Sequence, residues 1–123
     1  EYINIERLNH FFDSDLGKRY RQSNSVFKEK AFVLKKKLEM TGEDDIFIQG
    51  IIDCYFEEEG EIILLDYKTD YLYGDGEILV DRYKTQLELY KEAIESITGK
   101  KVKETYIYSF FKNQSIPVIL ENS

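Results

Sequence analysis

A short apolar run near the middle of the chain ends in charged residues: Ile62-Ile63-Leu64-Leu65-Asp66-Tyr67-Lys68-Thr69-Asp70. A continuous apolar run of this length, preceded by a turn signal, is typical of a buried strand. Residues two apart in a strand share a face, so Asp66 and Lys68 point the same way and Tyr67 points the opposite way. The run therefore predicts a strand that carries a carboxylate and an ammonium group to one face of a sheet.

A second strand is expected just upstream, from Ile46 to Phe56, and the acidic segment Glu57-Glu58-Glu59-Gly60-Glu61 between the two strands reads as a turn. If the third and fourth residues of that segment form a two-residue hairpin turn, the register places Asp53 directly opposite Asp66. Directly opposed residues have Cβ atoms about 4.5–5.5 Å apart. The hairpin therefore predicts two neighbouring carboxylates.

Two carboxylates this close repel each other unless a cation or a proton lies between them. With Lys68 on the same face, Asp53 and Asp66 form the group that metal-assisted phosphodiester hydrolysis uses. It offers hard oxygen ligands for magnesium and an ammonium group that positions or deprotonates water, or offsets phosphate charge. The alternative is a solvated ion pair of Asp66 and Lys68 at a strand end, because surface charge pairs are common. The residues alone leave both interpretations open.

The composition fits a single folded domain. The chain has 123 residues, of which 42% are hydrophobic and 15% aromatic, which is enough for one core and argues against disorder. No apolar run reaches about 18 residues, so no membrane span is expected. The chain shows no signal-peptide pattern and does not begin with methionine, and we expect it to be a segment of a longer protein.

Cys54 is the only cysteine, which excludes a disulfide framework, a cysteine-rich zinc module or a four-cysteine iron–sulfur cluster built within this chain. A reducing, cytoplasmic setting is consistent with it. The net charge of −7 weakens an expectation of nucleic-acid binding, which needs cationic surface. Local basic patches nevertheless occur at Lys35-Lys36-Lys37, at Lys100-Lys101, and at Arg19 and Arg21, so the charge does not exclude DNA as a partner.

Two elements are expected before the hairpin. The apolar spacing predicts a helix over residues 3–16 that ends at Gly17, followed by a polar connection over residues 18–25. Alternating residues over 25–38 predict a strand, in which Glu29 shares a face with apolar neighbours. Glu29 is either an edge-strand charge or a residue near the site. The apolar stripe of the helix comprises Ile5, Leu8, Phe11 and Phe12.

A turn is expected over residues 41–45, and Gly50 indicates a bulge or the close approach of a ligand or another backbone. Residues 71–80 read as a mobile loop. Asp81 is then expected to be the N-cap of a helix from Arg82 to Thr98 that Gly99 closes. The helix stripe that should face the sheet comprises Tyr83, Gln86, Leu87, Tyr90, Ile94 and Ile97.

Two further strands are expected over residues 102–111 and 116–120, and Pro117 indicates that the second is an edge strand. The predicted order is helix, three strands, helix and two strands. It favours an α/β fold in which a mixed sheet is flanked by helices.

Three motifs follow one another in the order and with the spacing of a known family: Gly50-Ile51-Ile52-Asp53, Asp66-Tyr67-Lys68-Thr69 and Gln86-Leu87-Glu88-Leu89-Tyr90. They resemble the nuclease domain of the RecB family, within the PD-(D/E)XK superfamily, and most of all the C-terminal nuclease domain of AddA-type helicase-nuclease subunits. The segment before the motifs, from Phe11 to Phe32, is also similar to that family. The resemblance implies a restriction-endonuclease-like fold over residues 1–123.

The resemblance implies a role for each motif residue. Asp53 and Asp66 would bind Mg²⁺ or Mn²⁺, with the Tyr67 carbonyl as a further ligand, and Lys68 would be the catalytic lysine.

Three other residues receive roles in the same way. Gln86 and Tyr90 would line the site from the helix and help to position DNA. Glu29 would support the site indirectly.

One family feature is missing. The family carries a metal-binding histidine in a G-T-x-x-H motif upstream, and His10 lacks that context, so the role is not transferred to it. A lone helical histidine is more often a boundary residue than a ligand. The matching helix and the helicase part are expected before residue 1, and the chain alone is expected to cleave DNA poorly or not at all. Relatives with cysteine-bound iron–sulfur clusters are disfavoured by the single cysteine.

The sequence thus favours a metal-dependent DNA exonuclease domain of an ATP-dependent helicase-nuclease acting in double-strand-break repair and recombination. The resemblance implies two partners, DNA and, through the parent protein, an AddB-like partner subunit; it implies no membrane. An alternative is a non-catalytic module that guides DNA or docks another subunit while retaining the nuclease fold. A stand-alone small nuclease is a third possibility, which the absent upstream motif disfavours.

Overall fold

The structure, a computed structural model, describes residues 4–37, 45–69 and 76–120. Five strands form one sheet in the order β1-β2-β3-β4-β5, in which β3 and β4 are parallel and the other neighbours are antiparallel. The predicted α/β fold with a mixed sheet flanked by helices is confirmed, and it is consistent with a restriction-endonuclease-like fold. The elements are α1 (Ile5–Asp13), α2 (Asp15–Gln22), β1 (Val26–Lys37), β2 (Asp45–Glu58), β3 (Glu61–Lys68), α3 (Gly76–Thr98), β4 (Val102–Ser109) and β5 (Gln114–Pro117).

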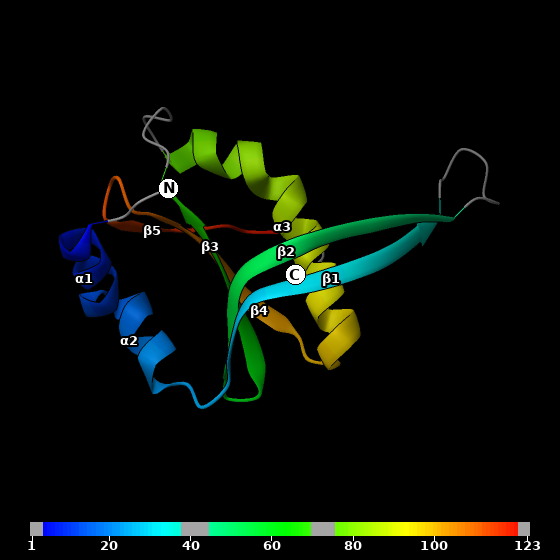
Figure 1. Cartoon of the computed structure of the whole chain (residues 1–123), viewed down its shortest axis with the longest axis horizontal. Helices are drawn as coiled ribbons and strands as arrows, with labels where there is room; N and C mark the ends of the chain where they lie inside the picture. The colour runs from blue at the N-terminus through cyan, green and yellow to red at the C-terminus, as the bar shows by residue number, and fades with distance from the viewer. Residues whose placement is uncertain (1–3, 38–44, 70–75, 121–123) are drawn as a thin grey trace.

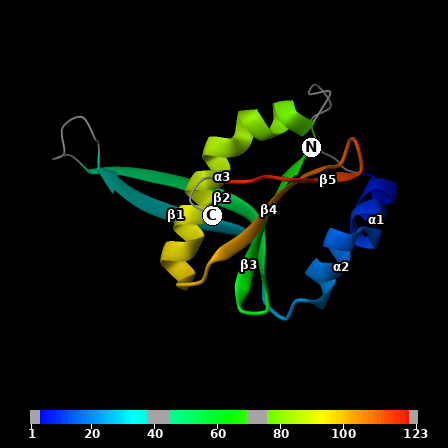
Figure 2. The ribbon, with the colours of Figure 1, turned by 180° about the vertical axis from the view of Figure 1, so that it is seen from behind.

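Helices cover both faces of the sheet, with α1 and α2 on one face and α3 on the other (Figures 1 and 2). The central strand β3 contributes Ile62 and Leu64 to the core under α3, and Ile63 and Leu65 to the core under α1 and α2. All four side chains are fully buried. A strand buried on both faces needs apolar residues at consecutive positions, which explains the continuous run. No helix in the described part of the chain is long and apolar enough to cross a membrane.

The first predicted helix is wrong in its bounds, because the chain forms two helices there. Ser14 separates them: its backbone N–H bonds the carbonyl of Phe11 to end α1, and its hydroxyl accepts from the N–H of Gly17 to cap α2. Gly17, expected to end a helix, lies inside α2, and residues 18–22 of the expected connection are helical. A Cβ on Gly17 would lie 1.9 Å from the Phe11 carbonyl oxygen, so glycine permits this close approach. Ile5 and Leu8 of the expected stripe are exposed.

The alternation of β1 is interrupted at Glu29. The register pairs Lys28 with Cys54 and Lys30 with Ile52, which leaves Glu29 opposite Asp53. Even-numbered residues before this pair face the core under α1 and α2, whereas even-numbered residues after it, such as Phe32, face α3. The predicted unbroken alternation over residues 25–38 is therefore wrong, because Glu29 has a φ of 50° that breaks the pleat.

Beyond this interruption the two strands continue as a two-stranded arm, which we call the hairpin arm (residues 30–37 and 45–52). Figure 1 shows the arm curving away from the rest of the sheet, with α3 along one side. Its Lys37 and Asp45 form the last pair before the described residues end. Asp45 thus belongs to a strand and not to the predicted turn, of which residues 41–44 lie outside the described residues.

The predicted hairpin between β2 and β3 is confirmed. Glu59 and Gly60 have φ values of 54° and 83°, as a type I′ turn requires at both central positions. Cys54 then pairs with Leu65, which is the predicted register. The expected turn was too long, because Glu57, Glu58 and Glu61 are strand residues.

Helix α3 begins at Gly76, so the helix starts earlier than predicted and Asp81 lies inside it, not at its N-cap. Residues 76–80, expected in a loop, are helical, and residues 71–75 lie outside the described residues. The end is as predicted: Gly99 has a φ of 70° and donates its N–H to the Glu95 carbonyl. Ile97 was expected to face the sheet, but it is 55% exposed, because it lies in the last turn at the edge of the stripe.

The last two strands differ slightly from the prediction. β4 ends at Ser109, and β5 spans Gln114–Pro117, before most of the expected segment 116–120. β5 is at the edge of the sheet and Pro117 ends it, as the missing N–H of proline favours.

Candidate functional site

The site begins where the pairing of β2 and β3 stops. Cys54 and Leu65 form the last backbone pair, so Asp53 and Asp66 occupy the next opposed position. The backbone N–H of Tyr67 donates to Oδ2 of Asp53 at 2.9 Å. A side-chain carboxylate thus takes the place of the strand carbonyl that would otherwise accept this hydrogen bond, and it holds Asp53 beside the end of β3.

Asp66 is a buried carboxylate paired with Lys68. Its residue exposure is 2%, and its Oδ2 lies 2.9 Å from the Lys68 Nζ. Among the described residues, Oδ2 receives no hydrogen bond of acceptable geometry. Asp66 and Lys68 are therefore not a solvated surface pair, because the Lys68 side chain is only 16% exposed and the Asp66 side chain only 3% exposed.

Burial raises the pKa of Asp66 to about 7, and the neighbouring Asp53 carboxyl raises it in the same direction. The Lys68 ammonium group acts against both. When both carboxyl groups are ionised, their two negative charges exceed the single positive charge of Lys68, so the electrostatic potential at the site is negative. A site of this kind attracts a proton or a cation.

Helix α3 brings Tyr90 and Gln86 to the same face of the sheet. The amide of Gln86 donates to the Tyr90 hydroxyl at 2.6 Å. Burial raises the pKa of Tyr90, and the negative charge of Asp66 adds to this effect. The amide on the helix stripe thus has a partner within the site.

Gly50 provides the space for this arrangement. A Cβ at this position would lie 3.0 Å from the Phe32 ring and 3.9 Å from the Tyr90 ring. Phe32 and Tyr90 contact each other edge to face, with centroids 5.6 Å apart. The sequence predicted a bulge or the close approach of a ligand or another backbone at Gly50, whereas the group that approaches it is an aromatic side chain of the neighbouring strand.

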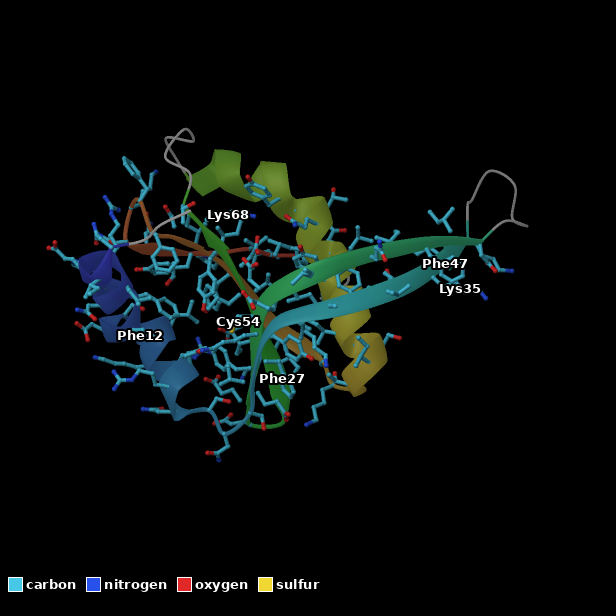
Figure 3. The ribbon with its side chains drawn as sticks, in the orientation of Figure 1. Phe12, Phe27, Lys35, Phe47, Cys54 and Lys68 are labelled. Atoms are coloured by element: carbon cyan, nitrogen blue, oxygen red, sulfur yellow. The ribbon has the colours of Figure 1, made fainter. Side chains whose placement is uncertain are left out.

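Tyr83 is a site residue that the sequence identified only as a member of the helix stripe. The Lys68 Nζ lies 3.7 Å from the centroid of the Tyr83 ring, which is a close cation–π contact. Figure 3 shows Lys68 at the end of β3. The sequence signal that could have identified Tyr83 as a site residue is its spacing: it lies three residues before Gln86 and seven before Tyr90, on one helix face.

Glu29, His10 and Cys54 are not part of the cluster formed by Asp53, Asp66 and Lys68. Glu29 is exposed and is opposite Asp53 across the β1–β2 ladder. His10 is exposed on α1, on the other side of the sheet. Cys54 is buried on that side as well, and burial raises the pKa of its thiol to about 11, so it stays protonated at neutral pH.

The donor set for a metal is therefore small. Within the described residues no three histidine, cysteine, aspartate or glutamate side chains come together as a metal site. Asp53 and Asp66 supply carboxylate oxygens. The N–H and C=O of one strand residue point to the same side, so the hydrogen bond from Tyr67 to Asp53 directs the Tyr67 carbonyl toward this side as well.

The predicted basic patches are largely engaged in ion pairs. Arg19 contacts Glu58 at 2.7 Å and Glu104 at 3.0 Å. Lys36 contacts Glu92 at 2.9 Å, on the arm side of α3. These pairs join elements of the fold and reduce the cationic surface that those patches offer to a phosphate backbone.

Fold and site together define an α/β domain, consistent with a restriction-endonuclease-like fold, that has two carboxylates and a lysine at the end of its central strand. No family model matches the chain. The chain is 48% identical over 118 residues to the AddA-type subunit of an ATP-dependent helicase/nuclease from a Thermoanaerobacter species, covering 89% of this chain and 10% of that protein.

Two further proteins of the same name support this relationship. The chain is 42% identical over 122 residues to the protein of Alkaliphilus oremlandii, and 38% identical over 133 residues to that of Clostridium perfringens. These matches cover 93% and 97% of this chain. The chain spans about a tenth of the length of these relatives, 10% in each case, and is related to AddA-type helicase/nuclease subunits.

Proposed function

We propose that this chain is the metal-dependent nuclease domain of an AddA-type helicase-nuclease, of the PD-(D/E)XK superfamily, and that it acts as a DNA exonuclease in double-strand-break repair and recombination. The observation that carries the proposal is the buried Asp66, which has Asp53 opposite it and Lys68 at 2.9 Å. The names of the relatives, which include nuclease activity, support it.

Asp53, Asp66 and the Tyr67 carbonyl are the residues that would hold Mg²⁺ or Mn²⁺. The fit rests on the buried Oδ2 of Asp66, which among the described residues has the Lys68 ammonium at 2.9 Å but accepts no hydrogen bond, and on hard oxygen donors, which these ions prefer. Magnesium is commonly bound by one or two carboxylates and completes its shell with water and substrate phosphate. The ion would supply electrostatic stabilisation of the phosphate and of the attacking oxygen.

The residues around this donor set receive complementary roles. The Lys68 ammonium would offset charge on the phosphate or orient the attacking water. Gln86 and Tyr90, joined by their hydrogen bond, would line the site and position the DNA. Glu29 would support the site through the backbone, because it lies at the interruption that places Asp53.

A second candidate function is a non-catalytic module that guides DNA or docks an AddB-like partner subunit. The net charge of −7 and the ion pairs of Arg19 and Lys36 favour it, because they leave little general attraction for phosphate. In the proposed enzyme, other parts of the protein and the partner subunit would bring DNA to the site.

The decisive experiment is a metal titration followed by NMR. Mn²⁺ should broaden the backbone resonances around Asp53 and Asp66, and Asp66→Asn should abolish this effect. Asp45→Asn is the matched control, because Asp45 pairs with Lys35 in the hairpin arm, eight residues before Asp53.

Cleavage then separates the two functions. Magnesium-dependent degradation of linear DNA by the full-length helicase-nuclease, which Lys68→Ala reduces by about 10²–10⁴-fold with metal binding retained, supports the enzyme. Metal binding without cleavage by the full-length protein favours the guiding or docking module. Absence of cleavage by this chain alone does not, because the chain alone is expected to cleave DNA poorly or not at all. A folded chain in which saturating Mn²⁺ perturbs neither carboxylate contradicts the metal site.

A further inference from the structure

We infer that Tyr83 is the positioning residue for Lys68 in this site: its ring holds the lysine ammonium where a phosphate or an attacking water would need it. The inference rests on the proposed nuclease function. It starts from one contact, the 3.7 Å between Lys68 Nζ and the centroid of the Tyr83 ring. That distance is well inside the range of about 6 Å over which an ammonium group and an aromatic face attract each other.

Two groups from different elements hold the ammonium. Asp66, two residues away on β3, lies at 2.9 Å, and Tyr83 approaches from α3. A lysine side chain has many rotamers, and fixing them costs free energy. With a contact on the strand side and a contact on the helix side, Nζ has one preferred position between β3 and α3. The Lys68 side chain is 16% exposed, so bulk water screens these contacts only partly.

The contacts of Lys68 with Asp66 and with Tyr83 would respond differently to a bound metal ion. An Asp66 carboxylate that shares its charge with a bound cation attracts Lys68 less strongly, because the opposing positive charge offsets the attraction. The aromatic face of Tyr83 carries no charge that the cation could neutralise. Tyr83 is therefore the contact that would still hold the ammonium when metal and phosphate are present, which is the state in which the position of Lys68 matters.

The place of Tyr83 in α3 suits this role. The helix begins at Gly76, so Tyr83 lies about two turns inside it and not in a first turn that frays. Leu87 and Ile94, on the same face, are completely buried against the sheet. This packing fixes the helix, and with it the ring, relative to β3.

The contact can be tested without any nuclease assay. Protons that lie over the face of an aromatic ring shift upfield, so the ε-methylene protons of Lys68, assigned with Lys68→Arg, should be upfield of those of other lysines. Tyr83→Phe should keep the shift and Tyr83→Leu should remove it. Tyr106→Leu is the matched control, because it deletes a partly buried tyrosine that packs on the α1 and α2 side, and the shift should persist. Persistence of the shift in Tyr83→Leu would contradict the inference.

The positioning role is tested by the kinetics of magnesium-dependent DNA cleavage by the full-length helicase-nuclease, because this chain alone is expected to cleave DNA poorly or not at all. Tyr83→Leu should lower kcat by about 3- to 30-fold, the range that a cation–π contact of a partly desolvated lysine supports. KM for DNA and the affinity for Mn²⁺ should stay within about twofold, and Tyr83→Phe should restore kcat.

Other results have distinct meanings. Unchanged kcat in Tyr83→Leu, or a rise in KM alone, would overturn the inference, the latter because it points to a ring that stacks on DNA bases. A full-length wild-type protein that binds no metal at this site and cleaves no DNA would instead overturn the proposed function, and the NMR shift of Lys68 would still report the contact.

Discussion

Glu29 lies opposite Asp53 in the β1–β2 ladder, and both strands change the faces of their alternating residues at this pair. The φ of 50° at Glu29 is unfavourable for a residue with a side chain. At this interruption Asp53 is not paired in the β1–β2 ladder, and its carboxylate accepts a hydrogen bond from the N–H of Tyr67. The geometry of the candidate site thus depends on a strained residue of the neighbouring strand.

This relationship predicts that the backbone of Glu29 matters more than its charge. Glu29→Gly should leave the free energy of unfolding unchanged or raise it slightly, because glycine adopts positive φ without strain. Glu29→Val should lower it by about 1–2 kcal/mol and weaken the binding of Mn²⁺. Glu29→Gln, the control that keeps size and removes charge, should change neither. Urea unfolding and the metal titration measure both quantities, and a loss of metal binding in Glu29→Gln would assign the role to the carboxylate instead.

A second prediction concerns the junction of α1 and α2. Gly17→Ala should destabilise the fold by about 3 kcal/mol or more, because the new Cβ would lie 1.9 Å from a backbone oxygen and backbone cannot move aside cheaply. Gly50→Ala should cost less, because the atom it meets at 3.0 Å belongs to the Phe32 side chain. Thermal unfolding of the two variants gives the comparison. Equal losses would show that α1 shifts freely over α2.

The sequence predicts the central hairpin well because its signals are local. Glycine in a two-residue turn fixes the register by itself, and a continuous apolar run specifies a strand buried on both faces. Asp53, Asp66 and Lys68 follow directly from that register and from the period of a strand. The end of α3 at Gly99 has a comparably local cause, since glycine favours positive φ at this position.

The remaining features depend on packing that no local pattern expresses. Glutamate rarely adopts a positive φ, so the sequence did not predict that the alternating residues of β1 exchange faces at Glu29. Gly17 resembles a helix end, but it is required inside α2 by the backbone of α1. The contact of Tyr83 with Lys68 needs the relative position of helix and strand, which the period of the helix alone does not give.

The third prediction uses the ion pair between α2 and β2. Hydrogen bonds from Arg19 lower the pKa of Glu58 from 4.5 to about 2, against the opposing effect of burial, and Lys103 adds to the lowering. A carboxyl with a depressed pKa in the folded state contributes stability above its unfolded pKa, and this is lost as the pH falls from about 4.5 toward 2. The side chain is partly exposed, so the contribution is of the order of 1 kcal/mol.

The measurement is the difference in unfolding free energy between the wild type and Glu58→Gln as a function of pH. The wild type should be more stable at pH 6, and the difference should shrink toward pH 2.5. Glu92→Gln, which removes an exposed pair with Lys36, should show a smaller and flatter difference. A constant difference for Glu58→Gln would show that its pair with Arg19 contributes nothing specific.

The last prediction concerns Asp66, whose pKa of about 7 has the opposite consequence. A carboxyl with a raised pKa in the folded state keeps its proton there while the unfolded chain has lost it. The stability it contributes is fully present below the unfolded pKa of about 3.8 and is lost as the pH rises through 7. Without divalent metal, the free energy of unfolding should therefore fall between pH 5 and pH 8, by at most about 1.4 kcal/mol per pH unit.

Two changes should remove this slope for different reasons. Asp66→Asn removes the titrating group. Saturating MgCl₂ should replace the proton with a cation, so that stability above pH 7 rises, and binding below pH 7 should release the proton of Asp66. Urea unfolding at pH 5, 6, 7 and 8, with MgCl₂ or with an equal ionic strength of NaCl, makes the comparison. His10→Gln controls for the one histidine of the chain, which is exposed on α1 and should leave the slope in place. A slope that survives in Asp66→Asn, or a response to MgCl₂ that NaCl reproduces, would remove Asp66 from both the titration and the metal site.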